Sequence, residues 1–440
     1  MEGTGLWTRT EVRAIVALTV FAFALRTGWL LTAHPAAVSD ALGYKSLAGR
    51  WLHEGLYERG GQPTAWRTPG YIAFLSGGLV FSDSDLWLGF LNVVAAATIV
   101  PLIAVVARRL NLSARVALIA AGLAAVMPPL VFWSVVLGPE NLQAPLLLAA
   151  LVLAADPRRR RGSAIWSGLA FGVAILVRPE SIVYLPVVAL VVVPARWREV
   201  GVRTVVVSAV ALALCVPWVV RNQLQVGSVG LSSVGGVNFY FAHRDDGYGY
   251  VPYQKTKLAG LDEVAMSKRG YELGIENLRD DPVRLLGDIV EGTQQLYEPP
   301  RYAPWFSTRA FAKVAPYPPS VSGSFLSVVQ RVNVVVWYTI AGLAVTGWIL
   351  LVTRRRRAAL VITGFAVANW VCFAVVFWAI PRYRFPIEPL LCLSAAVAID
   401  TLIRGSRPFF SHGTDPSAHS ESRTPADVFT RRSHQNGAER

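Results

Sequence analysis

The stretch TRRRRAALVITGFAVANWVCFAVVFWAIPRYRFPIEPLLCLSAAVAIDTLIR, residues 353–404, decides the fold class of this protein. Two apolar runs of about twenty residues each are separated by a short polar turn, and arginines flank the pair at both outer ends. A helix needs about 17–25 mostly apolar residues to cross the core of a bilayer. The pattern therefore predicts two membrane-spanning helices that run in opposite directions.

Apolar runs of this length recur along the whole chain of 440 residues, of which 53% are hydrophobic and 16% are charged, with a mean hydropathy of +0.43. In soluble proteins, about a quarter of all residues are charged. The sequence therefore predicts an all-α polytopic membrane protein. Because Cys215, Cys372 and Cys392 all lie inside apolar runs, we expect them to pack in the interior rather than to form disulfides or a metal site.

Ten spans account best for the positions of the arginines, because basic residues favour the cytoplasmic ends of membrane helices. The expected spans are residues 12–33, 86–107, 114–137, 140–155, 162–177, 180–194, 203–220, 327–352, 358–380 and 385–403. With ten spans, all six arginine clusters lie on the same side of the membrane. The clusters are Arg9 and Arg13; Arg108, Arg109 and Arg115; Arg158 to Arg161; Arg196, Arg198 and Arg203; Arg354 to Arg357; and Arg404 and Arg407. The apolar stretch 69–81 is too short to span and is interpreted as re-entrant or interfacial.

The predicted domain organisation follows from these spans. Residues 1–403 form one transmembrane domain with two extracytoplasmic loop regions, 34–85 and 221–326, and the span at 12–33 is an uncleaved anchor. The polar tail 404–440 lacks an apolar period and is expected to be disordered and cytoplasmic. Both termini would then be cytoplasmic, in a multi-pass protein of the cell membrane.

Several charged residues lie on the side that should be poor in them, at the outer ends of spans. They are Arg178, Arg221, Arg382, Arg384 and Glu140, and Asp40 and Arg67 of the first loop lie on the same side. A converging cluster of guanidinium groups is suited to a phosphate held at the membrane surface. The alternative is a set of interfacial anchors or structural ion pairs, which is the better interpretation for Arg26, Glu180 and Glu388.

Asp40 stands at the start of an amphipathic helix that follows the first span. One interpretation is structural, with Ser39 capping the helix and the acid placed favourably in the first turn. The other is catalytic, because the same position keeps the carboxylate ionised at the interface, as a general base requires. The aromatic and glycine-rich stretch NFYFAHRDDGYGYVPY, residues 238–253, offers either stacking faces for a sugar or a loop that packs on itself.

Six stretches, in this order, resemble the GT-C glycosyltransferases, in particular the bacterial branch similar to protein O-mannosyltransferases and lipid A aminoarabinose transferases. They are SDALGYKSLAGRWLHEGLY, RTPGYIAFL, VMPPLVFWSVVLGPENLQAPLLL, GLAFGVAILVRPESIVYLPV, PWVVRNQLQVGSVGLSSVGGVNFYFAHRDDGYGYVP and PRYRFPIEPLL. The resemblance implies a GT-C fold, a polyprenyl-phosphate sugar donor and an extracytoplasmic active site. It assigns the role of base to Asp40 and that of the second acidic residue to Glu140.

The expected reaction is an inverting transfer of the sugar to an extracytoplasmic hydroxyl acceptor, with the arginines on the leaving phosphate. Candidate phosphate ligands are Arg178, Arg221, Arg382 and Arg384, and candidate substrate-binding residues are Tyr44, Arg67, Asn238, Tyr240 and His243. No cofactor is expected, although the sequence leaves open whether the reaction uses a divalent metal. The expected partners are the lipid-linked donor, membrane lipids and a protein, lipid or glycan acceptor; nucleic acid is not expected. Ala41 and Ala242-His243 depart from the mannosyltransferase pattern, so the acceptor is left open. The alternatives are a lipid or sugar transporter and a non-catalytic cell-envelope assembly protein.

Overall fold

The computed structural model describes residues 7–37, 39–156, 161–192, 197–299 and 323–405, and these residues are almost entirely helical. The two strands of the described chain, β1 (Glu58–Arg59) and β2 (Gln62–Pro63), form a small antiparallel hairpin. The predicted all-α class is therefore confirmed. The predicted tail falls outside the described residues from position 406 onward, as do Arg158 to Arg160 of the predicted arginine cluster.

Ten helical segments coincide with the ten apolar runs. They are α1 (Arg9–Ala33), α4 (Asp85–Ala97) with α5 (Ile99–Arg109), α6 (Ala114–Val126) with α7 (Pro128–Phe132) and η1 (Trp133–Val135), α8 (Glu140–Ala154), α9 (Arg161–Val177), η2 (Pro179–Tyr184) with α10 (Val187–Val192), α11 (Trp197–Val226), α15 (Gly323–Arg354), α16 (Arg356–Trp370) with the π-helix η5 (Val371–Val376), and η6 (Pro381–Ile387) with α17 (Glu388–Arg404).

Within the described ranges, six of these segments are long and apolar enough to cross a membrane, and the bent pair α6 and α7–η1, which turns by 55°, adds a seventh. Helices α8 and α9 are apolar but shorter. The number of ten spans therefore stays a prediction. The stretch 69–81 forms α3 (Pro69–Leu79), a short helix outside this set, in agreement with its interpretation as a segment that does not span.

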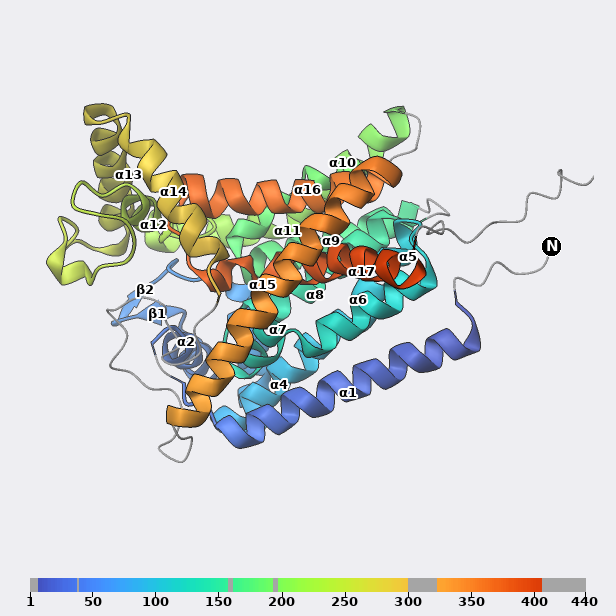
Figure 1. Ribbon diagram of the computed structural model, residues 1–440. Coiled ribbons are helices and arrows are strands. Elements are labelled where there is room, and N and C mark those ends of the chain that lie inside the picture. Colours follow the sequence, from blue (N-terminus) through green and yellow to red (C-terminus); the bar gives the residue numbers. More distant parts are fainter. Residues whose placement is uncertain (1–6, 38, 157–160, 193–196, 300–322, 406–440) are drawn as a thin grey trace, which may run out of the picture.

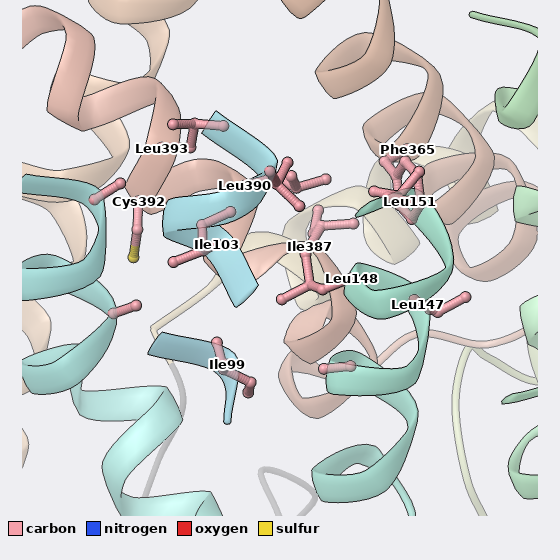
Figure 2. Close-up of a cluster of buried hydrophobic side chains, with 14 of the residues drawn as sticks. Ile99, Ile103, Leu147, Leu148, Leu151, Phe365, Ile387, Leu390, Cys392 and Leu393 are labelled. Carbon is pink, nitrogen blue, oxygen red and sulfur yellow. The ribbon is translucent and has the colours of Figure 1, made fainter. Parts of the chain in front are cut away.

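One part of the hydrophobic core lies where α5, α8, α16, η6 and α17 meet, as Figure 2 shows. Ile103 of α5, Leu148 and Leu151 of α8, Phe365 of α16 and Leu390 of α17 are all buried there. Helix α17 also packs against α6 and α15, and α9 packs between α8 and α11. Cys215, Cys372 and Cys392 are free thiols buried in the interior, so their predicted packing role is confirmed.

Arginines from distant parts of the chain meet at one end of the bundle, here called the arginine end. Arg115 at the start of α6 and Arg404 at the end of α17 each lie 3.1 Å from the carboxylate of Asp400. Arg203 of α11 donates to the carbonyl of Ala154, where α8 ends. These contacts place the ends of α8 and α17 beside the starts of α6 and α11, as the sidedness argument predicts.

The opposite end, here called the loop end, carries the two loop regions. The first contains α2 (Asp40–Glu54), the β1–β2 hairpin and α3, and the second contains α12 (Gly235–Ala242), η3 (Tyr253–Lys255), α13 (Glu263–Asp280) and α14 (Arg284–Tyr297). Figure 1 shows α2 and the hairpin at the same end of the bundle as α12, α13 and α14, with the start of α1 at the other end.

Thiol labelling tests which end faces the cytoplasm. A cysteine at Asp246, whose side chain is 67% exposed at the loop end, should react with a membrane-impermeant maleimide in intact cells. A cysteine at the exposed Arg356, at the arginine end, should react only after permeabilisation. The unsubstituted protein, whose three cysteines are buried, is the control. Labelling of the Arg356 site in intact cells would show that the predicted orientation is wrong.

Candidate functional site

The Asp40 carboxylate is held between two guanidinium groups. Nη2 of Arg67 donates to Oδ1 at 2.6 Å, and Nη2 of Arg382 donates to Oδ2 at 2.6 Å. Ser39, at φ 52°, occupies the N-cap position but makes no side-chain hydrogen bond to the helix, so the interpretation that its side chain caps α2 is wrong. The position of the carboxylate is thus fixed by tertiary contacts from the first loop and from η6.

The charge state of Asp40 follows from these two contacts. Burial by itself raises the pKa of a carboxyl group, but Arg67 and Arg382 together outweigh it and hold the pKa of Asp40 well below its usual range. Asp40 is therefore ionised at neutral pH. Its side chain is still 28% exposed, so the carboxylate remains accessible from the cavity described below.

Glu140 is the first residue of α8 and is almost fully buried, with 1% of its surface exposed. Its carboxylate accepts hydrogen bonds from Nη1 of Arg178 and from Nε1 of Trp133, the latter at 3.3 Å, and Nε of Arg382 lies 3.8 Å from Oε1. Gly138 makes this arrangement possible, because a Cβ at that position would lie 2.8 Å from the Glu140 carboxylate. The second predicted acid thus shares Arg382 with the first.

These contacts join six charged groups into one alternating series: Arg67, Asp40, Arg382, Glu140, Arg178 and Glu180. The last link runs from Nη2 of Arg178 to Oε1 of Glu180, at 3.2 Å. Of the arginines that the sequence predicts to converge, Arg67, Arg178 and Arg382 do so, and an equal number of carboxylates balances their charge. This balance reduces the cost of removing charge from water, because each ion keeps an opposite charge in contact.

Aromatic rings cover the faces of the guanidinium groups. The Tyr383 ring centre lies 4.9 Å from the guanidinium carbon of Arg178 and 5.3 Å from that of Arg382, and the Tyr44 ring centre lies 4.7 Å from that of Arg67. Stacking of this kind leaves the N–H groups at the edge of each guanidinium available for hydrogen bonds. Tyr44 was among the predicted binding residues, whereas Tyr383 was not.

The series lines a cavity that opens between the two loop regions and the ends of the spans. The lining includes seven residues from the predicted site: Asp40, Tyr44, Arg67, Glu140, Arg178, Asn238 and Arg382. Asn238 belongs to α12 and accepts a hydrogen bond from Nε1 of Trp378 at 3.1 Å. Residues that are up to 342 positions apart in sequence therefore face one space.

Four predicted site residues lie elsewhere. Arg384 is fully buried, pairs with Glu388 and donates to the carbonyl of Leu296. Arg221 donates to the backbone carbonyls of Thr64 and Tyr57.

The other two residues are on or beside α12. Tyr240 is buried beside Phe241, and Nδ1 of His243 lies 3.0 Å from Oδ2 of the buried Asp288. None of these four residues belongs to the cavity lining in the described part of the chain, although two of their partners, Phe241 and Glu388, do.

An aromatic wall faces the charged residues, and sequence reasoning identified only part of it. Its rings belong to Trp66, Phe241, Tyr250, Tyr253 and Trp378. Phe241 and Tyr250 meet edge-on at 5.3 Å between ring centres, whereas Phe241 and Tyr253 are stacked at 6.0 Å. Burial raises the pKa of Tyr253 to about 12, so its hydroxyl stays protonated and can donate a hydrogen bond at neutral pH. The aromatic stretch 238–253 predicted three of these rings, those of Phe241, Tyr250 and Tyr253, but no local pattern indicated Trp66 or Trp378.

A metal site is not apparent in the part of the chain that the structure describes, where no three His, Cys, Asp or Glu side chains are grouped to hold an ion. The acidic residues of the cavity instead have arginine partners. The site is therefore described by its charged and aromatic side chains alone.

Comparison with known families gives one match, a family model described as dolichyl-phosphate-mannose-protein mannosyltransferase, over residues 67–220. This range contains Arg67, Glu140 and Arg178. Comparison with curated protein sequences gave no match.

Among solved structures, the chain is similar to the archaeal oligosaccharyltransferase AglB from Archaeoglobus fulgidus in complex with an inhibitory peptide and a dolichol-phosphate, with 14% identity and a TM-score of 0.53, covering 92% of this chain and 53% of that one. It is also similar to ArnT from Cupriavidus metallidurans bound to undecaprenyl phosphate, with 17% identity and a TM-score of 0.54, covering 88% of this chain and 60% of that one.

The chain thus spans little more than half the length of the solved structures that it matches. At these identities the similarity concerns the fold. The chain resembles the GT-C membrane glycosyltransferases in architecture, as the ordered sequence stretches predict.

The position of Arg384 leads to a stability prediction. Arg384→Met should leave Glu388 buried without its cation, which typically costs about 3–5 kcal/mol, so the unfolding temperature in detergent should fall. Changing Glu388→Leu as well should recover much of this loss, and Arg269→Met, which removes an exposed pair, should change little. An unchanged unfolding temperature together with weakened donor binding would instead support the prediction that Arg384 is a phosphate ligand.

Proposed function

We propose that this chain is an integral-membrane glycosyltransferase that moves a sugar from a polyprenyl-phosphate donor to an acceptor hydroxyl, with inversion at the anomeric carbon. The observation that carries the proposal is the carboxylate of Asp40, which is ionised, accessible from the cavity and in contact with Arg382, which also lies beside Glu140. A base and a cationic phosphate site are thus adjacent, as a transfer from a lipid phosphate requires.

The reaction requires one proton acceptor. The acceptor oxygen attacks the anomeric carbon, its proton passes to Asp40, and the bond between the anomeric carbon and the phosphate oxygen breaks. The electron pair of that bond leaves with the lipid phosphate, which gains one negative charge. Because phosphate departs without being protonated, a single carboxylate suffices, unlike in glycosidases, which need an acid as well as a base.

Phosphate binding and the activation of Asp40 are linked through Arg382. With both oxygens engaged by guanidinium groups, Asp40 is a weak base. A donor phosphate competes with Asp40 for the N–H groups of Arg382, and each charge-assisted hydrogen bond is worth roughly 1.5–3 kcal/mol. When Arg382 turns to the phosphate, Asp40 keeps Arg67 but loses one stabilising cation, so its basicity rises where the acceptor binds.

Glu140 and Arg178 support this exchange. Glu140 contacts Arg178 and lies 3.8 Å from Arg382, so it holds both cations close to the phosphate position and keeps them from repelling each other. Arg178 is the second phosphate ligand, and Tyr383 holds the plane of its guanidinium by stacking. The aromatic wall opposite offers apolar faces to the sugar of the donor or the acceptor.

Lipid carriers bound in structures of the same fold support the choice of donor, because dolichol-phosphate is bound in AglB and undecaprenyl phosphate in ArnT. In this proposal residues 1–403 form the transmembrane domain in the cell membrane, the loop end is extracytoplasmic and the termini are cytoplasmic. The proposed reaction needs no cofactor. The acceptor is a protein, lipid or glycan hydroxyl.

A transporter is the main rival. Transporters usually place their polar site near the middle of the membrane on broken helices. Here the charged cavity is built from the loop-end termini of α8, α9 and η6 and from the first loop, which favours a reaction at the membrane surface. Sugar transfer by the purified protein distinguishes an enzyme from a transporter or an assembly protein.

Replacement of the proposed base tests the mechanism. Asp40→Asn keeps the volume and one of the two acceptor oxygens but cannot take up the proton, so the transfer rate should fall by about 100- to 10000-fold. The amount of folded protein and the donor lipid retained on purification, measured by mass spectrometry, should stay near wild type. Asp246→Asn, at an exposed position of the second loop, is the control. If Asp40→Asn keeps most of its activity, Glu140 becomes the next candidate base.

Replacement of the shared arginine tests the phosphate site. Arg382→Lys keeps the charge but loses the planar fork, so donor use should weaken by about ten- to a hundredfold, since every 1.4 kcal/mol is a factor of ten. The measurement is the transfer rate against donor concentration in nanodiscs, with Arg50→Lys of the first loop as the control. Wild-type kinetics for Arg382→Lys would instead support a role as an interfacial anchor.

A further inference from the structure

We propose that Glu263, in the first turn of α13, is a positioning residue that fixes Arg67 against Asp40 by tying the second loop region to the first. The inference rests on the proposed function, because it assigns Arg67 to the same reaction. Glu263 lies outside the cavity lining and was not among the residues that the sequence indicated.

The segment that Glu263 holds is residues 64–67, which links the β1–β2 hairpin to α3 and has no regular secondary structure. Thr64, Ala65 and Trp66 are nevertheless buried, with 1%, 0% and 5% of their surface exposed. A buried irregular segment needs hydrogen-bond partners for its backbone, because an unpaired N–H or C=O group inside a protein is costly. Those partners therefore determine where the segment lies.

The Glu263 carboxylate accepts three hydrogen bonds, two of them from this segment. Oε2 accepts a hydrogen bond from Oγ1 of Thr64 at 2.6 Å, and Oε1 accepts one from the backbone N–H of Ala65 at 2.7 Å. Oε1 also accepts from Oγ of Ser233 at 3.2 Å, which belongs to the second loop region. The charged carboxylate makes these bonds stronger than neutral ones.

Ser232 and Ser233, just before α12, add two more hydrogen bonds between the second loop region and segment 64–67. The backbone N–H of Ser233 donates to the carbonyl of Ala65 at 2.9 Å, and Oγ of Ser232 donates to the carbonyl of Trp66 at 3.0 Å. The second loop region thus pairs with consecutive residues of the first, although about 170 positions separate them in sequence.

Arg221 holds the segment from the other side. Its Nη1 donates to the carbonyl of Thr64 at 2.6 Å, and its Nη2 donates to the carbonyl of Tyr57 at 3.0 Å, where the hairpin begins. The hydroxyl of Tyr57 in turn donates to the carbonyl of Arg67 at 2.9 Å. Arg221, predicted as a phosphate ligand, therefore acts on the backbone that carries Arg67.

These contacts end at the proposed reaction centre, because Arg67 directly follows the held segment and its guanidinium donates to Asp40. A displacement of about 1 Å in a group that orients a catalytic residue can cost about a hundredfold in rate. Loss of the Glu263 carboxylate releases the segment at Thr64 and Ala65, so it should loosen Arg67 without touching Arg178 or Arg382. The expected defect is in turnover rather than in donor binding.

Glu263→Ala and Glu263→Gln test this inference with donor kinetics. Glu263→Ala should lower kcat by about 10- to 100-fold while the KM for the donor changes by less than about threefold. Glu263→Gln keeps one acceptor oxygen and should recover part of kcat. The control is Glu272→Ala on the same helix, whose side chain is 44% exposed and pairs only with Arg269 among the described contacts.

A double-mutant cycle separates positioning from general stabilisation of the loops. If Glu263 acts through Arg67, Glu263→Ala should have little further effect in an Arg67→Ala background, whereas an unrelated role would give additive losses. Additive losses, or a wild-type kcat in both Glu263 variants, would overturn the inference.

Hydrogen exchange provides a measurement that does not need activity. Amides of residues 57–67 should exchange faster in Glu263→Ala than in wild type or Glu272→Ala. If the wild-type protein transfers no sugar, the proposed function is refuted, whereas faster exchange in Glu263→Ala would still support the contact between the loops. Unchanged exchange would overturn the inference whatever the activity.

Discussion

The carboxylate of Asp40 binds two arginines that reach it from opposite ends of the chain, and the rest of the site depends on this contact. Arg67 comes from the first loop and Arg382 from the segment before the last helix. They meet only because α17 packs against α6 while α6 packs against α1, which brings the first and last spans into one bundle. The helical core thus sets the position of a group that local sequence leaves undefined.

Charge balance explains why such a cluster is tolerated beside a membrane. Removing an ion from water costs several kcal/mol, and the cost is recovered only when an opposite charge and hydrogen bonds replace the solvent. In the series from Arg67 to Glu180 every ion touches at least one of opposite sign. In the proposed reaction, a phosphate that enters this series competes with a carboxylate for its arginines, so binding of the phosphate and release of Asp40 from Arg382 occur together.

The two loop regions behave as one structure for a related reason. Ordering an irregular segment costs about 1–2 kcal/mol of backbone entropy per residue, and residues 64–67 have little regular structure to offset it. Hydrogen bonds from Glu263, Ser232, Ser233 and Arg221 supply the offset. Each loop therefore depends on the other for its order.

The sequence by itself determined the membrane class, the approximate limits of the helices and the end of the bundle at which the charged residues lie. Hydropathy and charge act over about twenty neighbouring residues, which is within the reach of a local pattern. For this reason Asp40, Glu140, Arg178 and Arg382, each at the outer end of an apolar run or just beyond it, were predicted together and line one cavity.

Only the tertiary structure decided which charged residues face the cavity and which hold the protein together. Arg382 and Arg384 are two positions apart on η6, yet one contacts Asp40 and the other is buried against Glu388 and Trp337. Their local sequence is nearly the same, so no pattern separates them. The difference arises from the neighbours that packing brings to each side chain, and those neighbours lie up to hundreds of positions away.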